Sequence, residues 1–375
     1  MSDVLTEVRG SVGCITLNRP RALNALSLPM IRNLSAALRD WRDDPAVAAV
    51  AIRGVNKDPS SPSGSRPFGA FCAGGDIRFF HLAVLAGNPE LEDFFTEEYT
   101  LNYLIHHYPK PYVAFLDGIV MGGGMGISQG SRLRIVTERT KMAMPETAIG
   151  LFPDVGGGYF LGRCPGRIGE YLALTGHVIG GQDALVAGLA DLELPSAGLP
   201  ALWEALATQP AAALAGLQQQ SATKNIAANV QLVSARADID HYFGLGTVPD
   251  IVAALEAGAS PWATETAALL RKRSPLMLHV VLEQVRRGRG MALADDLRME
   301  RDMVHRCFHL RPGTAGETME GIRAVAVDKD HHPRWSPARI EDVTPAMVAV
   351  FFESPWTPAA HPLRDLDAGP GAAAS

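Results

Sequence analysis

Two carboxylates lie eight residues apart in the segment from residue 144 to 160, which otherwise consists mainly of apolar residues, prolines and glycines. They belong to Glu146 and Asp154. Burying a carboxylate is costly unless it is paired or neutralised, so placing two in so apolar a segment predicts a use for both. Pro153 and the glycines at 156–158 predict a turn that leads into a helix. This geometry would hold both acids on one wall of a pocket.

A purely structural explanation accounts for the same residues. Glu146 follows Pro145 and would then be an acid in the first turn of a helix, where the helix dipole favours negative charge. Asp154 would cap the helix that begins near Gly156. The segment alone does not decide between the two explanations.

The composition indicates a globular chain long enough for one large or two ordinary domains, with 375 residues of which 47% are hydrophobic and 20% charged. A net charge of -6 with interspersed acids and bases argues against a nucleic-acid partner, although it is compatible with a local basic patch for a phosphorylated ligand.

No signal-like segment opens the chain, and no stretch approaches the roughly 20 apolar residues of a membrane span. We therefore expect a cytoplasmic protein with no membrane partner. The widely spaced Cys14, Cys72, Cys164 and Cys307 predict free thiols.

Segments with strand character and segments with helical spacing alternate in the first half of the chain, which predicts an α/β fold. The strand-like segments are 12–17, 47–52, 112–116 and 132–136, and the helical ones are 29–41 and 91–107. Beyond residue 159 the pattern becomes mainly helical, with helices expected at 168–174, 181–188, 201–217, 274–287 and 292–308. Residues 56–69, rich in Pro, Ser and Gly, predict an exposed and mobile loop. We expect a catalytic core at 1–195, a helical region at 196–355 and a disordered tail at 356–375.

Two glycine runs, at residues 74–75 and 122–124, each follow a strand-like segment and can aim backbone N–H groups into a cleft. Two such donors that converge on one oxygen would form an oxyanion hole, which stabilises charge developing on a carbonyl oxygen. For either run alone, a tight turn or close packing is the simpler explanation. A dinucleotide-binding turn fits less well, because Gln129 stands where the fingerprint requires glycine.

Two further candidates are weaker. His305 and His309 stand four residues apart on an expected helix, a spacing that metals use, but no third ligand is evident nearby, which favours surface or packing histidines. Ser128 lies in a G-x-S-x-G pattern without an evident Asp and His in order behind it, so a serine hydrolase is not indicated.

Three motifs in matching order and spacing resemble the enoyl-CoA hydratase/isomerase superfamily, also called the crotonase fold. They are residues 73–77 (AGGDI), 117–124 (DGIVMGGG) and 145–146 (PE). A longer segment, 143–161, is similar to the signature of the 3-hydroxyisobutyryl-CoA hydrolases, and the similarity continues at 171–176, 320–324 and 328–330. The resemblance covers about residues 5 to 350. It implies a crotonase-type spiral of repeated ββα units with a helical C-terminal region.

The resemblance implies roles for individual residues. It assigns the oxyanion hole to the N–H groups of Gly75 and Gly123, the catalytic glutamate to Glu146, the second acid of the hydrolases to Asp154, a substrate contact to Glu98, and a loosely matched contact near the CoA phosphates to Arg21. The hydratases carry a second catalytic glutamate at the position of Gly126. Because this chain has no carboxylate there, it lacks one of the two glutamates that add water to a double bond in the hydratases.

The reaction that the resemblance implies is hydrolysis of a short-chain 3-hydroxyacyl-CoA thioester, above all 3-hydroxyisobutyryl-CoA in valine catabolism. Glu146 would act as a nucleophile or as a base on water, and one sequence leaves this choice open. No metal or redox cofactor is needed, since CoA is part of the substrate. The alternatives are an enoyl-CoA or dienoyl-CoA isomerase or hydratase of the same superfamily, and a non-catalytic acyl-CoA-binding protein. A homo-oligomer is compatible with the sequence.

Overall fold

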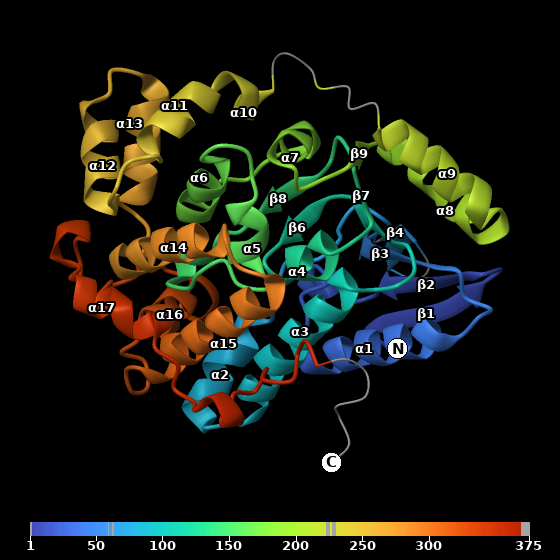
Figure 1. Ribbon diagram of the computed structural model, residues 1–375, viewed down its shortest axis with the longest axis horizontal. Helices are drawn as coiled ribbons and strands as arrows, with labels where there is room; N and C mark the ends of the chain where they lie inside the picture. Colours follow the sequence, from blue (N-terminus) through green and yellow to red (C-terminus); the bar gives the residue numbers. More distant parts are fainter. Residues whose placement is uncertain (1, 59, 62–63, 223–225, 227–229, 369–375) are drawn as a thin grey trace. The chain divides into compact units, whose positions relative to one another are not determined.

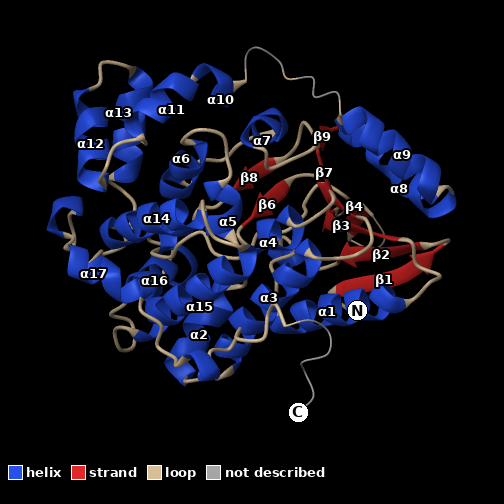
Figure 2. Cartoon of the chain, in the orientation of Figure 1, coloured by secondary structure: helices blue, strands red, loops and turns tan. Residues whose placement is uncertain are grey.

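The computed structural model describes all residues except 1, 59, 62–63, 223–225, 227–229 and 369–375. The chain forms two compact units, each made of three sequence segments. Unit 1 comprises Met1–Gly75, Leu101–Ala143 and Val178–Ser234, and unit 2 comprises Asp76–Thr100, Met144–His177 and Ala235–Ser375. All strands found in the described residues belong to unit 1, whereas unit 2 is built from helices (Figure 2). The expected boundary at residue 195 divides the chain differently and stays a prediction.

A mainly parallel sheet forms the centre of unit 1 (Figure 1). Its strands run in the order β1-β2-β3-β5-β7-β9, and β4 pairs with β3 beside this path. Their bounds are β1 (Val4–Arg9), β2 (Val12–Leu17), β3 (Ala49–Lys57), β4 (Ser65–Pro67), β5 (Tyr112–Leu116), β7 (Leu133–Val136) and β9 (Leu192–Glu193). A second, two-stranded parallel sheet pairs β6 (Ile119–Met121) with β8 (Lys141–Ala143). The parallel pairing with helical connections confirms the α/β class.

Helices cover this sheet and complete the core of unit 1. They are α1 (Leu28–Asp43), α4 (Gly123–Gln129), α7 (Gly181–Ala187), α8 (Leu199–Thr208), α9 (Pro210–Ser221) and α10 (Gln231–Ser234). Phe68, Phe115 and Trp203 pack with ring centroids 5.4–6.2 Å apart, which joins α8 to the sheet. One helix was expected over 201–217, but Pro210 lacks the N–H that would continue α8, so a new helix begins there.

Unit 2 packs helices around a cluster of aromatic rings. Phe80 from α2 (Ile77–Ala86), Phe94 and Phe95 from α3 (Glu90–His106) and Phe308 from α15 (Leu293–His309) form this cluster. The other helices are α5 (Gly157–Gly162), α6 (Ile168–Thr175), α11 (Arg236–Tyr242), α12 (Val248–Ala257), α13 (Pro261–Leu270), α14 (Pro275–Gly288), α16 (Glu317–Ile322) and α17 (Pro345–Ala349). The helices expected at 168–174, 274–287 and 292–308 are confirmed within one or two residues at each end.

The structure differs from the sequence-based expectation in two segments. Residues 65–67, expected in a loop, form β4 against β3, and Phe68 beside them is buried, because its ring packs into the core of unit 1. The expected tail from residue 356 contains a 3₁₀ helix at Pro358–Ala360 and a buried Leu363, while residues 369–375 lie outside the described part. Residues 59 and 62–63 of the expected mobile loop likewise lie outside it.

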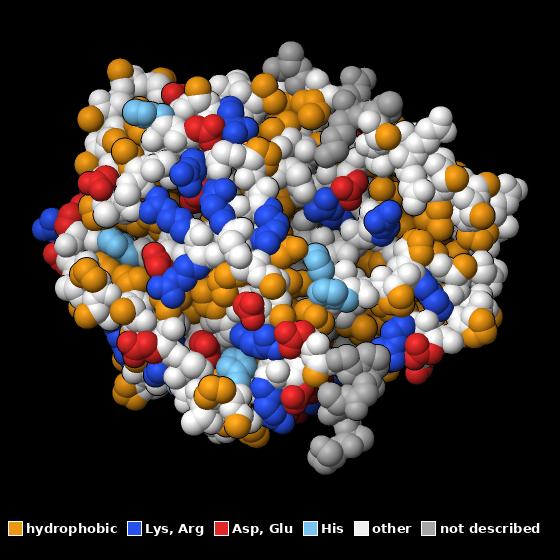
Figure 3. All heavy atoms as spheres, viewed as in Figure 1, with side chains coloured by type: hydrophobic (Ala, Val, Ile, Leu, Met, Phe, Trp, Pro, Cys, Tyr) orange, Lys and Arg blue, Asp and Glu red, His pale blue; other side chains and the backbone are white. Residues whose placement is uncertain are grey.

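Three predictions from composition can be compared with the structure. All four cysteines are buried free thiols, as their spacing predicted. Acidic and basic side chains are intermixed on the face shown in Figure 3. Within the described residues, no helix has the length and apolar character needed to cross a membrane.

Candidate active site

The two glycine turns converge in unit 1. Cys72 accepts a hydrogen bond from Met121 N–H at 2.9 Å, which aligns the first turn with β6. Gly74 has a φ of +102°, and a Cβ built there would lie 3.6 Å from the Gly123 nitrogen. A Cβ on Gly124 would lie 2.4 Å from the Cys72 carbonyl oxygen, so a larger residue is excluded. A close approach of the two turns through their backbones therefore accounts for glycine at positions 74 and 124.

Gly123 is the first residue of α4, so its N–H has no acceptor within the helix. This N–H can donate to an oxygen outside the helix, as an oxyanion hole requires. Ser128 lies at the other end of α4, where its buried hydroxyl donates to the Gly124 carbonyl at 2.8 Å. That contact is a local side-chain bond to the preceding turn, which leaves the serine-hydrolase alternative without structural support.

Three carboxylates come together in the interior of unit 2. Glu98 from α3, Glu146 and Asp154 are 2%, 7% and 6% exposed. The Tyr99 hydroxyl donates to Asp154 Oδ2 at 2.9 Å. Glu98 Oε1 and Glu146 Oε2 have no hydrogen-bond partner among the described residues. Buried and unsatisfied carboxylate oxygens are costly to stability, which is typical of groups kept for chemistry.

Burial and mutual repulsion keep protons on this cluster. Burial raises the pKa of Asp154 to about 7, although the hydrogen bond from Tyr99 acts in the opposite direction. Burial also raises the pKa of Glu146 well above its usual range, and the charge of Asp154 adds to the rise. The same two effects, with a further contribution from Glu146, raise the pKa of Glu98. Among the described residues, only Asp154 of the three acids accepts a hydrogen bond from another side chain that stabilises its charged form.

Neighbouring helices fix the turn that carries Glu146. Glu146 opens a 3₁₀ helix at Glu146–Ile149, which ends at Gly150 with a φ of +67°. Ser274 N–H, at the start of α14, donates to the Thr147 carbonyl at 3.1 Å. The Thr318 hydroxyl of α16 donates to the Gly150 carbonyl at 2.7 Å. Through these contacts, the start of α14 and the helix α16 lie beside this turn, although both are far away in the sequence.

Two acids of α15 hold the segment that follows Asp154. Glu300 accepts hydrogen bonds from the N–H groups of Gly156 at 2.7 Å and Gly158 at 2.8 Å. Asp296 accepts one from Tyr159 N–H at 2.9 Å. Between Asp154 and Gly156, Val155 has a φ of +58°, which is unfavourable for a β-branched residue. Glu300 therefore helps to keep a strained backbone in place beside Asp154.

Sequence reasoning missed Glu300 and Asp296. Their burial is complete, at 0% exposure for both residues. Burial raises the pKa of Glu300, and the charge of Asp296 adds to the rise. The available signal was a pair of acids four residues apart in a helix that also carries a strong apolar stripe. Such a pair is usually solvent-exposed, so the sequence alone gives no reason to place it beside residues 156–159.

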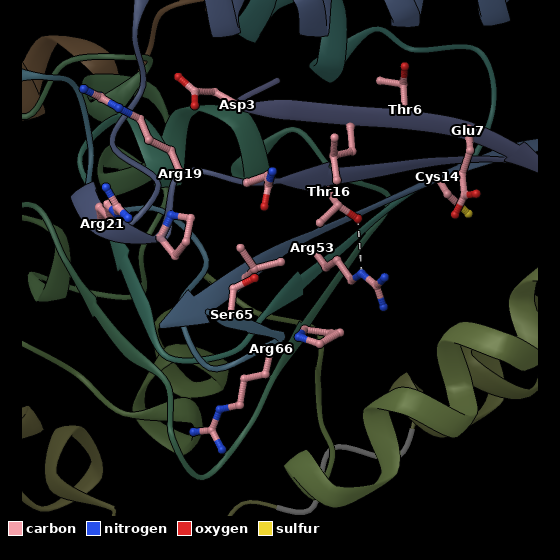
Figure 4. A pocket seen from close by; sticks show the side chains of 15 residues that line it. Asp3, Thr6, Glu7, Cys14, Thr16, Arg19, Arg21, Arg53, Ser65 and Arg66 are labelled. Carbon is pink, nitrogen blue, oxygen red and sulfur yellow. Dashed lines mark hydrogen bonds between the residues drawn. The ribbon is translucent and has the colours of Figure 1, made fainter. Parts of the chain in front are cut away.

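Arg21 lines a cavity of about 860 Å³ in unit 1, and it is the only predicted site residue that does so among the described residues (Figure 4). Arg19 and Arg21 lie near one another at one end of the group in Figure 4. Arg53 and Arg66 also line the cavity, and the acids on its wall are Asp3 and Glu7. The lining is thus rich in arginine, which suits an anionic ligand. Of the four arginines, Arg53 already has a partner within the protein, because its Nε donates a hydrogen bond to the Thr16 hydroxyl at 3.2 Å.

The structure decides against the purely structural explanation for Asp154. The helix α5 has Gly156 as its N-cap and no side-chain cap, while the Asp154 carboxylate is bound by Tyr99 instead. Glu146 does lie in the first turn of a 3₁₀ helix, yet its side chain is buried with one oxygen unpartnered, which the helix dipole does not require. Glu98, Glu146 and Asp154 are thus brought together in unit 2, and the two glycine turns in unit 1.

Unit 1 thus contains two glycine turns that touch through their backbones, and unit 2 contains a buried cluster of three carboxylates. The chain belongs to the enoyl-CoA hydratase/isomerase family, whose family model matches residues 12–352. This match confirms the superfamily that the three sequence motifs suggested.

Curated relatives and solved structures carry different names. The chain is 40% identical over 359 residues to the mitochondrial 3-hydroxyisobutyryl-CoA hydrolase of Rattus norvegicus, covering 94% of this chain and 89% of the relative. It is 40% identical over 362 residues to 3-hydroxyisobutyryl-CoA hydrolase 1 of Arabidopsis thaliana, covering 94% and 92%. A carnitinyl-CoA dehydratase structure from Mycobacterium thermoresistibile matches with a TM-score of 0.84 at 39% identity, covering 94% of this chain and 97% of that one. An enoyl-CoA hydratase structure from Rhodobacter sphaeroides matches at 0.81 and 39%, covering 94% and 98%.

Proposed function

We propose that this enzyme hydrolyses the thioester of 3-hydroxyisobutyryl-CoA to 3-hydroxyisobutyrate and CoA. The observation that carries the proposal is the buried cluster of Glu98, Glu146 and Asp154, in a chain that is about 40% identical to relatives named for this reaction. One water is consumed, the bond between carbonyl carbon and sulfur breaks, and the thiol leaves with a proton.

Each unit supports its own part of the mechanism. In unit 1, the N–H groups of Gly75 and Gly123 are the proposed donors to the thioester oxygen, where one such donor typically lowers the barrier by about 2.7 to 4 kcal/mol. In unit 2, Glu146 is the proposed nucleophile or general base, and its unpartnered oxygen favours it over Asp154 for this role. Asp154 would orient the substrate hydroxyl or the water, and Glu98 would fix the acyl end.

Hydration of a double bond is the second candidate, because the two solved structures above are named as a dehydratase and a hydratase. The residue at position 126 argues against it. Gly126 lies in α4 and is buried, so no carboxylate stands where the hydratases carry their second catalytic glutamate. Proton abstraction by one acid remains possible for this chain, whereas the two-glutamate addition of water does not.

Glu146→Gln tests the proposal. Gln keeps the size of the side chain but removes the base and nucleophile, so we expect release of CoA thiol from 3-hydroxyisobutyryl-CoA to fall by at least about 100-fold. A thiol reagent reports this release, and calorimetric binding of CoA verifies that the variant is folded. Retention of more than a tenth of the wild-type rate would contradict the role of Glu146.

A substrate panel separates the two candidate reactions. Wild-type enzyme is supplied with 3-hydroxyisobutyryl-CoA, 3-hydroxypropionyl-CoA and crotonyl-CoA, and both thiol release and absorbance of the conjugated double bond are recorded. We expect thiol release from the first two and little change of the conjugated absorbance with the third. Loss of that absorbance without thiol release would instead identify a hydratase.

Arg21 is the proposed contact for the CoA phosphates, since it lines the arginine-rich cavity of unit 1. Arg21→Ala should raise KM for the CoA thioester several-fold and leave KM for the matching pantetheine thioester unchanged, because pantetheine lacks the nucleotide phosphates. Arg39→Ala is the matched control, as Arg39 is exposed on α1 and does not line the cavity. An equal rise of KM for both thioesters would contradict the phosphate contact.

The proposed reaction would place the enzyme in valine degradation, where the substrate arises from an upstream acyl-CoA. Several relatives carry the word mitochondrial in their names, whereas cytoplasmic location is what we predict for this chain. A homo-oligomer and the absence of a cofactor likewise stay predictions. Fractionation of source cells tests the location, and size-exclusion chromatography of the purified protein tests the oligomeric state. Thiol release by enzyme freed of metal with a chelator tests the absence of a catalytic cofactor.

A further inference from the structure

Two histidines of α15 and one glutamate of α3 face one another in unit 2. His305 and His309 lie one helical turn apart, and their ring centroids are 4.4 Å apart. Glu92 Oε1 lies 2.7 Å from His309 Nε2 and 3.3 Å from His305 Nδ1. One donor atom from each of the three side chains lies within 4.8 Å of the others. Glu92 is thus a candidate third ligand beside the two histidines. No such ligand was evident nearby in the sequence, which had favoured surface or packing histidines.

Arg301 holds the Glu92 carboxylate from one side, which orients its other side toward a ligand. Its second oxygen, Oε2, forms an ion pair with the buried Arg301, whose Nε also donates to the Thr96 hydroxyl at 3.1 Å. Oε1 faces both histidines, and His305 Nδ1 lies almost as close to Oε2, at 3.4 Å, as to Oε1. A carboxylate that accepts a hydrogen bond through one oxygen and binds a metal through the other is the usual outer-shell arrangement of metal sites.

An aromatic side chain fixes the position of His305. The Trp356 ring centroid lies 4.7 Å from that of His305 and 4.8 Å from the Arg301 guanidinium carbon. The positive charge of Arg301 would oppose a nearby cation, but it is already paired with Glu92 and stacked on Trp356. The site is partly open, since the side chain of His309 is 42% exposed. Solvent can therefore supply a further ligand.

We propose that Glu92, His305 and His309 bind a divalent transition-metal ion of the zinc class, with water completing the coordination. Two imidazole nitrogens and one carboxylate oxygen are the donor set that such ions prefer over calcium or magnesium. The alternative is an ion pair between Glu92 and protonated histidine, which needs only one of the two rings. Two rings that both place a nitrogen beside the Glu92 carboxylate are better explained by a shared ion.

The bound ion would clamp α3 to α15. Glu92 lies less than two turns before Glu98 and Tyr99 on α3, and His305 lies less than two turns after Glu300 on α15. The helix α3 therefore carries Glu98 of the proposed acid cluster, and α15 carries Glu300, which holds the segment after Asp154. The clamp would raise the thermal stability of the protein, because the ion binds the folded chain and not the unfolded one.

Cobalt and zinc titrations of the metal-free full-length protein test this site. We expect one equivalent of Co²⁺ to give weak visible bands of a nitrogen and oxygen site without the intense absorption of thiolate ligands, since all four cysteines are buried elsewhere. Zinc should bind with the same stoichiometry in calorimetry and raise Tm. His309→Ala and Glu92→Gln should each weaken zinc binding by about 10-fold or more and remove the Tm shift.

The double variant His331→Ala/His332→Ala is the matched control, because these exposed neighbouring histidines lie outside the cluster. It should bind zinc like wild type. Zinc binding weaker than millimolar in the wild type, or binding retained by His309→Ala and lost in the control, would overturn the site. Binding without any change of Tm would overturn the clamp. The outcome is independent of the hydrolysis proposal, because metal-free His309→Ala should release thiol at the wild-type rate at a temperature well below its Tm.

Discussion

The buried cluster of Glu98, Glu146 and Asp154 combines acids that differ in how their charged forms are stabilised. Asp154 accepts a hydrogen bond from Tyr99, whereas Glu146 has an unpartnered oxygen and Glu98 another. As pH rises, Asp154 therefore loses its proton before Glu146 does. The negative charge of Asp154 then opposes ionisation of Glu146. If Glu146 acts as base or nucleophile, it must be ionised, and activity must rise with pH in a range set by the burial of Glu146 and by the charge of Asp154.

Asp154→Asn is expected to move the acid limb of the kcat/KM profile to lower pH. The negative charge of Asp154 raises the pKa of Glu146, so its removal lowers that pKa and Glu146 ionises earlier. Asn still offers an oxygen to the Tyr99 hydroxyl, which preserves the packing. The measurement is thiol release from 3-hydroxyisobutyryl-CoA between pH 5 and 9, scaled to each enzyme's own maximum so that a lower absolute rate does not matter.

Glu98→Gln is the companion variant for this profile. Burial and the charges of Asp154 and Glu146 all raise the pKa of Glu98, so Glu98 stays protonated and uncharged while Glu146 ionises. The acid limb should therefore stay in place while KM for the substrate rises. If Glu98→Gln moves the limb as far as Asp154→Asn does, Glu98 rather than Asp154 is the acid coupled to Glu146.

At the scale of elements, α15 supports the active-site segment from a distant part of the sequence. Glu300 accepts hydrogen bonds from Gly156 and Gly158, and Gln284 of α14 donates to the Pro153 carbonyl at 2.6 Å. These contacts lie on either side of Asp154 and Val155. The short helix α5 therefore depends on α14 and α15 for the position of its start.

Glu300→Gln should lower kcat by about 10- to 100-fold with little change of KM, because a shift of about 1 Å in a catalytic group has effects of this size. Gln turns one of the two acceptor oxygens into an N–H₂ group, so one backbone N–H of the segment loses its partner at a cost of about 1–3 kcal/mol. The measurements are steady-state kinetics and a thermal melt. Glu283→Gln on α14 is the control, since the Glu283 side chain is 43% exposed and ion-paired with Arg287. An equal loss of kcat in both variants would contradict the supporting role of Glu300.

Sequence patterns predicted most of the long elements and few of the short ones. The 29–41 segment corresponds to α1, and the strands at 12–17 and 112–116 were found with their bounds. The strand β1 was missed because four of its six residues are exposed, and β6 and β8 because three residues carry too little periodicity. Long elements are predictable because one face must be apolar over several turns, whereas short ones are selected by tertiary pairing.

The candidate site was predictable to a similar degree. Glu146, Asp154 and the glycine runs carry local signals, since acids in an apolar segment and repeated glycines are unusual wherever they lie. The partners of these residues carry no such signal. Glu300 and Glu92 are ordinary helix acids in the sequence, and only the fold places the first beside residues 156–158 and the second beside two histidines.

At the scale of the whole molecule, the two units interleave in the sequence. Unit 2 takes residues 76–100 and 144–177 from the first half of the chain and everything from residue 235 onward. Its aromatic cluster joins Phe80 and Phe95 to Phe308, and its acid segment is held by residues beyond 280. A catalytic core at 1–195, as predicted from the sequence, would contain the proposed catalytic acids without the residues that hold them.

A chain that ends at residue 195 is therefore expected to release no thiol from 3-hydroxyisobutyryl-CoA and to show no cooperative melting of unit 2. Without α14, α15 and α16, the N–H groups of Gly156 and Gly158 lose their acceptors and the phenylalanines of α2 and α3 lose Phe308. Circular dichroism melting and thiol release measure both effects. Full-length Glu146→Gln is the control, because it should melt like wild type while releasing no thiol, which separates loss of fold from loss of the catalytic group. Cooperative melting together with wild-type thiol release in the shortened chain would show that residues 1–195 fold and act alone, and that the contacts from α14 to α16 are dispensable.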